Sequence, residues 1–154
     1  MLQIRDANLE DFAALMQLYQ ELHPADPSFN ENSAREVFQQ ILATSGLHIF
    51  LLVNTTGELI ASCYLNVIPN LTRGARPYAI IENVITAEAK RGQGHGKAIM
   101  AHALAQAWQA GCYKVMLQTG SRKPATHAFY QACGFSGTDK HGYVAWQPGY
   151  KSAT

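Results

Sequence analysis

The segment "RGQGHGKAIM", from Arg91 to Met100, places three glycines at alternate positions directly before a helix-forming stretch. It follows the apolar run "YAIIENVIT" (78–86), which is rich in isoleucine and suits a strand buried on both faces. A plain connection would need fewer glycines, because each one costs conformational entropy. A buried strand, a glycine loop and a helix N-terminus together present free backbone N–H groups to an anion. We therefore expect a phosphate-binding loop; a tight connection without a ligand is the alternative.

The familiar nucleotide-binding motifs do not fit this segment. The NTPase phosphate loop, GxxxxGK[ST], would need a glycine where Arg91 stands and Ser or Thr where Ala98 stands. The dinucleotide fingerprint, GxGxxG, fails as well, since its third glycine falls on Lys97 or Ile99 in the two registers that can be tried. Neither kinase chemistry nor hydride transfer is supported.

The spacing of hydrophobic residues changes several times along the chain, between the helical and the strand pattern. Helical spacing covers 8–23, with Asn8 as a cap, and a second helix opens at "SARE", where Ser33 and Glu36 have capping-box spacing. The full order is βααβββαβαββ, which indicates an α/β or α+β domain. The expected strands are 2–7, 47–54, 58–68, 78–86, 113–119, 134–138 and 142–148, and the later helices run from the glycine loop to about 110 and within 123–135.

Composition limits the class of protein. A chain of 154 residues with 47% hydrophobic and 15% charged residues can bury one core, so we expect a single domain over 1–154. A net charge of +1 without a run of Lys or Arg gives no support to a nucleic-acid or membrane partner. Arg5 and Asp6 interrupt the first apolar stretch and no stretch suits a membrane span, which predicts a cytoplasmic protein. The cysteines lack CxxC spacing and predict neither a disulfide framework nor a metal site: Cys63, Cys112 and Cys133.

Two motifs together resemble one family. Arg91, Gly94 and Gly96 match the [RQ]xxGx[GA] pyrophosphate-binding signature of the GNAT N-acetyltransferases, and "FYQACGF" is similar to their late tyrosine-bearing segment. The order of elements matches from Leu2 to about Trp146, so the resemblance covers nearly the whole chain. It implies a mixed, mostly antiparallel central sheet flanked by helices. Within the family, "GCYKV" and "FYQACGF" are most similar to the glucosamine 6-phosphate N-acetyltransferases.

The resemblance implies acetyl-CoA as the acetyl donor and no metal. Val84, Ile85 and Thr86 would pair with the pantetheine arm like an added strand, and an amide near Val84 would polarise the thioester carbonyl. Lys123 stands where many family members have an Asn that contacts pantetheine, which leaves that side-chain contact open. The pyrophosphate would lie on the glycine loop and the helix start, formed by Arg91, Gly92, Gln93, Gly94, His95, Gly96, Lys97 and Ala98.

The resemblance also implies two catalytic side chains. Tyr130 occupies the position of the general acid, because a phenol of pKa about 10 can protonate a thiolate whose acid is near 8.5. The alternative for Tyr130 is an aromatic ring packed on the sheet. Glu82 is the candidate base, since a carboxylate inside an apolar run is costly unless it faces a cleft, a water or a partner. The alternative for Glu82 is a structural pair with a nearby Arg.

Other polar residues are weaker candidates. His127 lies near the helix face of Tyr130, and we interpret it as a hydrogen-bonded structural residue. Arg73 and Arg76 could meet an anionic acceptor, although solvated loop charges are commoner.

The leading hypothesis is an acetyl-CoA-dependent N-acetyltransferase that acts on a small-molecule primary amine by direct transfer. Acetylation of a protein or peptide amine is an alternative, and the loops at 23–32 and 70–77 would decide between them by leaving an open groove or closing over a small molecule. The alternative that is not an enzyme is a non-catalytic sensor that binds acyl-CoA. A homodimer is an open option for the assembly.

Overall fold

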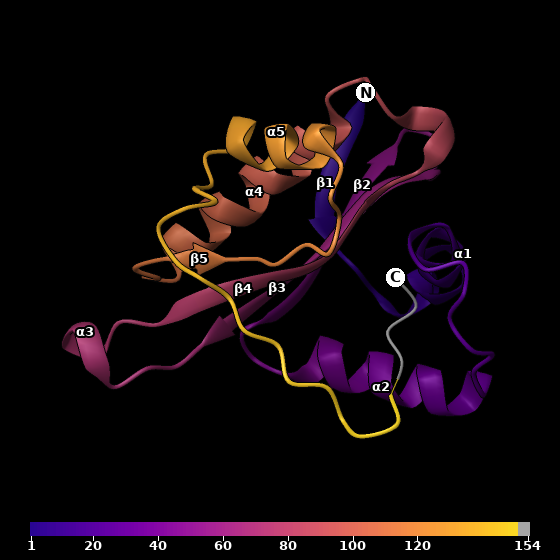
Figure 1. Ribbon diagram of the computed structural model, residues 1–154. Helices are drawn as coiled ribbons and strands as arrows, with labels where there is room; N and C mark the ends of the chain where they lie inside the picture. Colours follow the sequence, from indigo (N-terminus) through magenta and orange to yellow (C-terminus); the bar gives the residue numbers. More distant parts are fainter. Residues whose placement is uncertain (151–154) are drawn as a thin grey trace. The chain divides into compact units, whose positions relative to one another are not determined.

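A five-stranded sheet forms the body of the first of two compact units (Figure 1). The computed structural model describes residues 1–150, and the chain divides after Leu117 into a first unit, Met1–Leu117, and a second unit that begins at Gln118. The strands lie side by side in sequence order, and every pair is antiparallel except β4 with β5, which is parallel. Their bounds are β1 (Leu2–Asp6), β2 (Leu47–Asn54), β3 (Leu59–Ile68), β4 (Tyr78–Thr86) and β5 (Val115–Met116).

Helices cover both faces of this sheet (Figure 1). Helices α1 (Phe12–Leu22) and α2 (Glu31–Ala43) share a core with β2 on one face, and α4 (His95–Gln109) packs against β2, β3 and β4 on the other. The mixed, mostly antiparallel fold class is therefore confirmed. No helix within residues 1–150 is long and apolar enough to cross a membrane. The short elements are a 3₁₀ turn (Leu9–Asp11) before α1, α3 (Thr72–Ala75) between β3 and β4, and a 3₁₀ turn (Glu88–Lys90) before α4.

Strand β2 lies at the centre of the hydrophobic core. Ile49, Leu51 and Val53 pack with α1 and α2. Phe50 points to the opposite face, where its ring meets the edge of the His102 ring of α4 at a centroid distance of 4.7 Å. Both faces of β2 are covered, which explains why its sequence is a continuous apolar run rather than an alternating one.

The first helix starts as predicted and the second does not. Asn8 caps the 3₁₀ turn that leads into α1. The predicted capping box of Ser33 and Glu36 is wrong, because α2 already begins at Glu31 and Oδ1 of Asn30 accepts the backbone N–H of Ser33 at 3.0 Å. Asn30 is as good a cap as a serine and stands three positions earlier, so it sets the start of the helix.

The described part of the second unit contains one helix, α5 (Pro124–Ala132). Pro124 occupies its first turn, and Gly134, with φ of 93°, follows its C-terminal end as predicted.

The predicted terminal hairpin of 134–138 and 142–148 is wrong, since no strand follows α5 up to residue 150. The side chain of Tyr143 is 92% exposed and that of Val144 is also exposed. Without burial of these side chains, little offsets the conformational entropy lost in ordering two more strands. The apolar alternation of the sequence therefore produced a false strand signal.

Candidate active site

Strand β4 loses its partner on one side partway along its length. Its pairing with β5 is limited to Ala79 with Val115 and Ile80 with Met116. Within the first unit, the remaining residues 81–86 pair with β3 alone. The second half of β4 therefore presents an open edge, where backbone groups have no ladder partner from this unit.

A β-bulge lies at the start of this open edge. Tyr64 of β3 pairs with Glu82, and Ser62 pairs with Ile85. Two residues of β4, Asn83 and Val84, therefore stand opposite one residue of β3. Asn83 has φ of +50°, in the left-handed region that non-glycine residues rarely adopt. One strand gains a residue here, which increases its local bend and twist.

The bulge reverses the direction in which the backbone groups of β4 point. Before it, the N–H of Ala79 donates toward β5; after it, the N–H of Ala87 donates to Ile60 at the start of β3. Successive residues of a strand alternate between its two edges. The alternation places the backbone groups of Val84 and Thr86 on the open edge.

Of the three residues predicted to bind pantetheine, Ile85 is arranged differently from its neighbours. Its backbone pairs with Ser62 of β3, and its side chain is buried. An added strand at the open edge would therefore meet Val84 and Thr86 but not Ile85.

The glycine loop leads from this edge into α4. Gly92 has φ of 76°, and Gly94, with φ of 81°, is the N-cap residue of α4. A Cβ atom at either position would meet nothing within 4 Å, so these glycines are needed for their left-handed conformation rather than to relieve crowding. No side chain caps the helix and no acidic residue lies in its first turn. The amides at the start of α4 are therefore available to an anion.

The other predicted loop residues line the outside of this turn. Arg91 is exposed, and its Nε donates to the carbonyl oxygen of Thr86 at 3.1 Å, which ties the loop to the end of β4. His95 and Gly96 are half-buried in the first turn of the helix. The remaining predicted residues are exposed, namely Gln93, Lys97 and Ala98.

Glu82 lies immediately before the bulge, on the sheet face that carries α1 and α2. Its cross-strand partner Tyr64 packs against the core of that face, and burial raises the pKa of the Tyr64 phenol. The Glu82 side chain itself is exposed, so it does not bear the desolvation cost of a buried carboxylate. No ion pair within residues 1–150 involves Glu82.

Tyr130 belongs to α5 in the second unit, whereas Glu82 and the glycine loop belong to the first. Its half-buried ring lies edge-on to Phe129 at 5.1 Å and to Phe135 at 6.4 Å between centroids. The N–H of Phe135 donates to the carbonyl oxygen of Tyr130 at 3.1 Å, which closes the end of the helix. The ring is thus held by its own helix terminus.

Two weaker candidates have structural partners. The His127 Nε2 donates to the carbonyl oxygen of Ser121 at 2.8 Å, which confirms the structural interpretation of that histidine. Arg76 donates to the carbonyl oxygens of Gly111 at 3.2 Å and Cys112 at 3.3 Å, and so ties the loop before β4 to the loop that follows α4. Both groups therefore have roles that need no ligand.

An open hollow of about 450 Å³ lies elsewhere in the first unit, between the end of α2, the end of β1 and the start of β2. It includes Asp6 and His48, whose side chains form an ion pair of 3.0 Å when the imidazole is protonated. None of the predicted site residues lines it.

Sequence reasoning missed Asn83, the residue that forms the bulge. A signal was present, because asparagine is depleted in strands and is among the few residues that tolerate a left-handed backbone. An Asn in the middle of an isoleucine-rich strand can therefore be interpreted as a bulge marker.

Comparison with known proteins gives a consistent result. The profile of the acetyltransferase (GNAT) family matches residues 12–135, a range that runs through both units. Glucosamine 6-phosphate N-acetyltransferase 1 of Oryza sativa subsp. japonica is 29% identical over 135 residues, which cover 86% of this chain and 79% of that protein.

Two solved structures illustrate the likeness of fold. A proposed acetyltransferase from Agrobacterium tumefaciens str. C58 is 47% identical, with a TM-score of 0.88 over 94% of this chain and 99% of that one. Glucosamine-6-phosphate N-acetyltransferase of Arabidopsis thaliana is 21% identical, with a TM-score of 0.82 over 96% of this chain and 99% of that one, which is a likeness of fold alone.

Proposed function

Because the chain belongs to the acetyltransferase (GNAT) family, we propose that it moves the acetyl group of acetyl-CoA to a primary amine of a small molecule by direct transfer. The observation that carries this proposal is the bulged, half-unpaired β4 leading into an uncapped helix N-terminus. One continuous stretch of backbone thereby offers a strand edge for an extended arm and free amides for a pyrophosphate. Acetyl-CoA has both of these parts.

The donor would be held mainly by backbone groups. Val84 and Thr86 would hydrogen-bond the pantetheine arm at the open edge, and the amides from Gly92 to Ala98 would surround the pyrophosphate. The side chain of Arg91 is already engaged with Thr86, so it would brace the loop while its backbone contributes to the anion site.

The thioester carbonyl would lie against the bulge. As the amine nitrogen attacks the carbonyl carbon, negative charge develops on the carbonyl oxygen. An N–H fixed in direction by the sheet stabilises that charge without having to reorganise during the reaction. The amide of Val84 points to the open edge and is the best-placed donor for this purpose.

Two side chains would handle the protons. Glu82 would accept a proton from the ammonium of the bound acceptor, directly or through a water, which frees the nitrogen lone pair for the attack; its carboxylate is exposed beside the bulge and has no ion-pair partner within residues 1–150. The C–S bond then breaks, an amide forms, and the departing CoA thiolate takes a proton from the hydroxyl of Tyr130. We propose Tyr130 for this step from its position in the family motif.

An amino-sugar phosphate is the first acceptor to test, because two of the relatives described as glucosamine 6-phosphate N-acetyltransferases are similar to this chain in sequence. The second of them, from Trypanosoma brucei brucei, is 35% identical over 80 residues, which cover 52% of each protein. The proposal itself covers small primary amines more widely. Peptide acetylation and acyl-CoA sensing are the alternatives.

The test measures release of free CoA from acetyl-CoA with a thiol reagent, in the presence of glucosamine 6-phosphate and of a panel of other small amines and peptide N-termini. We expect release that depends on a small amine, with one acetylated amine formed for each CoA. Release only with peptides would favour the peptide alternative. Tight binding of acetyl-CoA without release for any amine would favour the sensor and refute the enzyme.

A further inference from the structure

The 3₁₀ turn Glu88–Lys90 joins the two stretches of backbone that would hold acetyl-CoA. The open edge of β4 ends at Thr86 before it, and the glycine loop begins at Arg91 after it. The residue that precedes the turn, Ala87, has no side chain that can cap it. A turn of three residues makes too few hydrogen bonds of its own to hold its place. Contacts from other parts of the chain therefore set its position.

Glu21 of α1 holds the start of this turn. Its Oε2 accepts the backbone N–H of Glu88 at 2.8 Å, across 67 positions of the sequence. Because the donor is a backbone group, the bond fixes the path of the main chain and not only a side chain. The end of α1 and the turn are thereby joined, although α2, β2, β3 and β4 lie between them in the sequence.

Glu58 holds the other end of the turn. Its Oε2 forms an ion pair of 3.1 Å with Nζ of Lys90 and accepts a hydrogen bond of 2.7 Å from Nδ2 of Asn54. Asn54 and Glu58 flank the connection between β2 and β3, so this contact comes from a different segment than that of Glu21. An exposed ion pair contributes little, whereas a carboxylate that accepts a backbone N–H makes a charge-assisted bond. Glu21 is therefore the stronger of the two supports.

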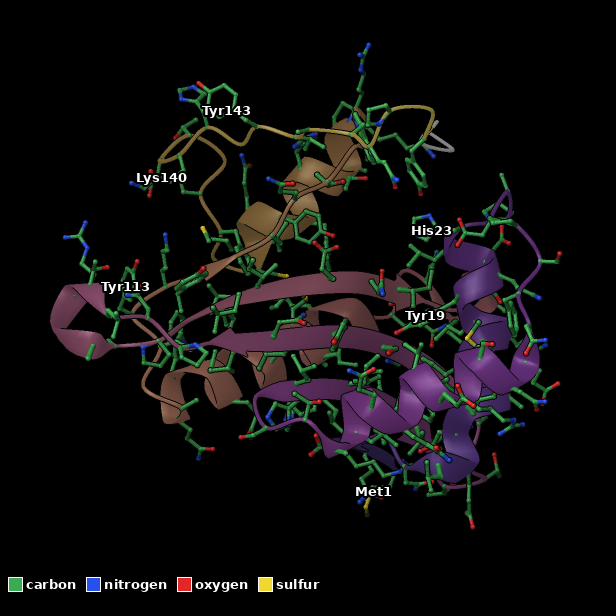
Figure 2. All side chains as sticks on the ribbon, turned by 90° about the horizontal axis from the view of Figure 1, so that it is seen from below. Met1, Tyr19, His23, Tyr113, Lys140 and Tyr143 are labelled. Carbon is green, nitrogen blue, oxygen red and sulfur yellow. The ribbon has the colours of Figure 1, made fainter. Side chains whose placement is uncertain are left out.

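Helix α1 gains nothing from a carboxylate at position 21. Glu21 lies in the last turn of α1, where the helix dipole disfavours negative charge, and that turn has no basic residue to offset it. Figure 2 shows this end of the helix, where Tyr19 and His23 are labelled. The contact with Glu88, and not the stability of its own helix, explains why a glutamate suits this position.

A ligand that occupies two sites depends on the distance between them. The pantetheine arm would lie along Val84 and Thr86, and the pyrophosphate would lie at the start of α4, so the turn between them sets their spacing. Two linked groups bind more tightly than either alone only when both sites can be reached at once. A shift of the turn would therefore weaken binding of the whole molecule and leave each separate site unchanged.

We propose that Glu21 is a positioning residue, which fixes the 3₁₀ turn so that the open edge of β4 and the glycine loop receive the two parts of one acetyl-CoA molecule together. Glu58 supports the same turn through Lys90. This inference rests on the proposed function, because it concerns the same cleft. It gives Glu21 no contact with acetyl-CoA and no part in the chemistry.

The experiment compares the wild type with Glu21→Ala and measures the affinity of each for three ligands. These are acetyl-CoA, ADP, which carries the pyrophosphate without the arm, and S-acetylpantetheine, which carries the arm without the pyrophosphate. Calorimetry suits acetyl-CoA, and titration followed by NMR suits the two weaker fragments. We expect the affinity of Glu21→Ala for acetyl-CoA to fall about three- to tenfold, the net effect of one hydrogen bond, and its affinity for each fragment to change by less than about twofold.

Two further variants separate positioning from a general structural role. Glu21→Gln keeps an oxygen that can accept the N–H of Glu88, so it should restore most of the affinity for acetyl-CoA. Glu36→Ala is the matched control, because Glu36 is also an exposed glutamate on a helix and no ion pair within residues 1–150 involves it. Its affinity for all three ligands should equal that of the wild type. The melting temperature of Glu21→Ala should change little, because the loss of one exposed hydrogen bond is offset by relief of the unfavourable charge at the end of α1.

Unchanged affinity for acetyl-CoA in Glu21→Ala would overturn the inference. An equal loss of affinity for acetyl-CoA and for one fragment would also overturn it, since Glu21 would then shape a single site and not the spacing of two. Wild-type protein that fails to bind acetyl-CoA would refute the proposed function and this inference together. Acetyl transfer by the wild type, combined with full affinity in Glu21→Ala, would refute this inference alone.

Discussion

Substitution of Gly94 by alanine is expected to weaken acetyl-CoA binding far more than it disturbs the fold. Gly94 has φ of 81° and ψ of 1° at the N-cap of α4, a conformation that costs a residue with a Cβ roughly 1–2 kcal/mol. The added Cβ would meet nothing within 4 Å, so no clash adds to this strain. In a domain of this size, the strain should lower the melting temperature by about 2–8 °C.

The loss of affinity has a different origin. The space in front of Gly94 is where a phosphate would approach the amides, and a methyl group there would keep it from at least one of them. A hydrogen bond to a charged group contributes about 1.5–3 kcal/mol, so affinity for acetyl-CoA should fall roughly ten- to a hundredfold. At saturating acetyl-CoA the value of kcat should change little, because in the proposed assignment the loop would hold the pyrophosphate and not the reacting atoms.

Gly111→Ala is the matched control. Gly111 follows the other end of α4, has φ of 83°, and likewise has no atom within 4 Å of a Cβ position. It should show a similar drop in melting temperature with unchanged affinity for acetyl-CoA. Calorimetry and thermal melts on both variants provide the comparison. Equal affinities in Gly94→Ala and the wild type, or an equal weakening in both variants, would refute the assignment of the loop.

Three further substitutions test other parts of the account. Tyr130→Phe should keep the fold and the affinity for acetyl-CoA but lower kcat by a factor of about 10² to 10⁴. An acyl donor whose thiol is more acidic should restore part of kcat. An unchanged kcat would make Tyr130 a packing residue. Glu82→Gln should leave the melting temperature unchanged and slow turnover most at low pH, where little free amine is available, and an unaltered pH–rate profile would exclude it as the base. The Arg5 guanidinium donates two hydrogen bonds of 2.7 Å to the Asp11 carboxylate and holds the pKa of Asp11 below its ordinary value. The pair therefore stabilises the folded protein fully above the ordinary carboxyl pKa. This stability is lost as the pH falls through the lowered pKa. Melting curves should therefore show Asp11→Asn destabilised at neutral pH and equal to the wild type in strong acid, and a constant difference across pH would contradict this linkage.

Local signals predicted most of the first unit correctly. The Ile-rich run at 78–86 coincides with β4, and the turn from Asn54 to Gly57 closes the β2–β3 hairpin, where the N–H of Gly57 donates to the carbonyl oxygen of Asn54 at 3.0 Å. These features depend on residues close together in the chain, for which period and turn chemistry are sufficient. The glycine loop was recognisable for the same reason.

Features that depend on contacts between distant segments were not predictable in this way. The bulge at Asn83 is a mismatch of register between β3 and β4: the asparagine marks its position in β4, but the residues of β3 that it faces are set by pairing with a separate strand. The predicted strand 113–119 is reduced to Val115–Met116, because a strand ends where its partner diverges and not where its apolar pattern stops. The open edge of β4 follows from that early end.

The most direct test of the central claim is the stoichiometry of acetyl transfer by the wild-type protein. Purified protein is incubated with acetyl-CoA and either glucosamine 6-phosphate or another small primary amine, and both free CoA and acetylated amine are quantified over time by mass spectrometry. The account predicts amine-dependent release of CoA with an equal amount of N-acetylated product for at least one small amine. Acetyl-CoA that binds but stays intact with every amine, or CoA release that is the same without any amine, would contradict it.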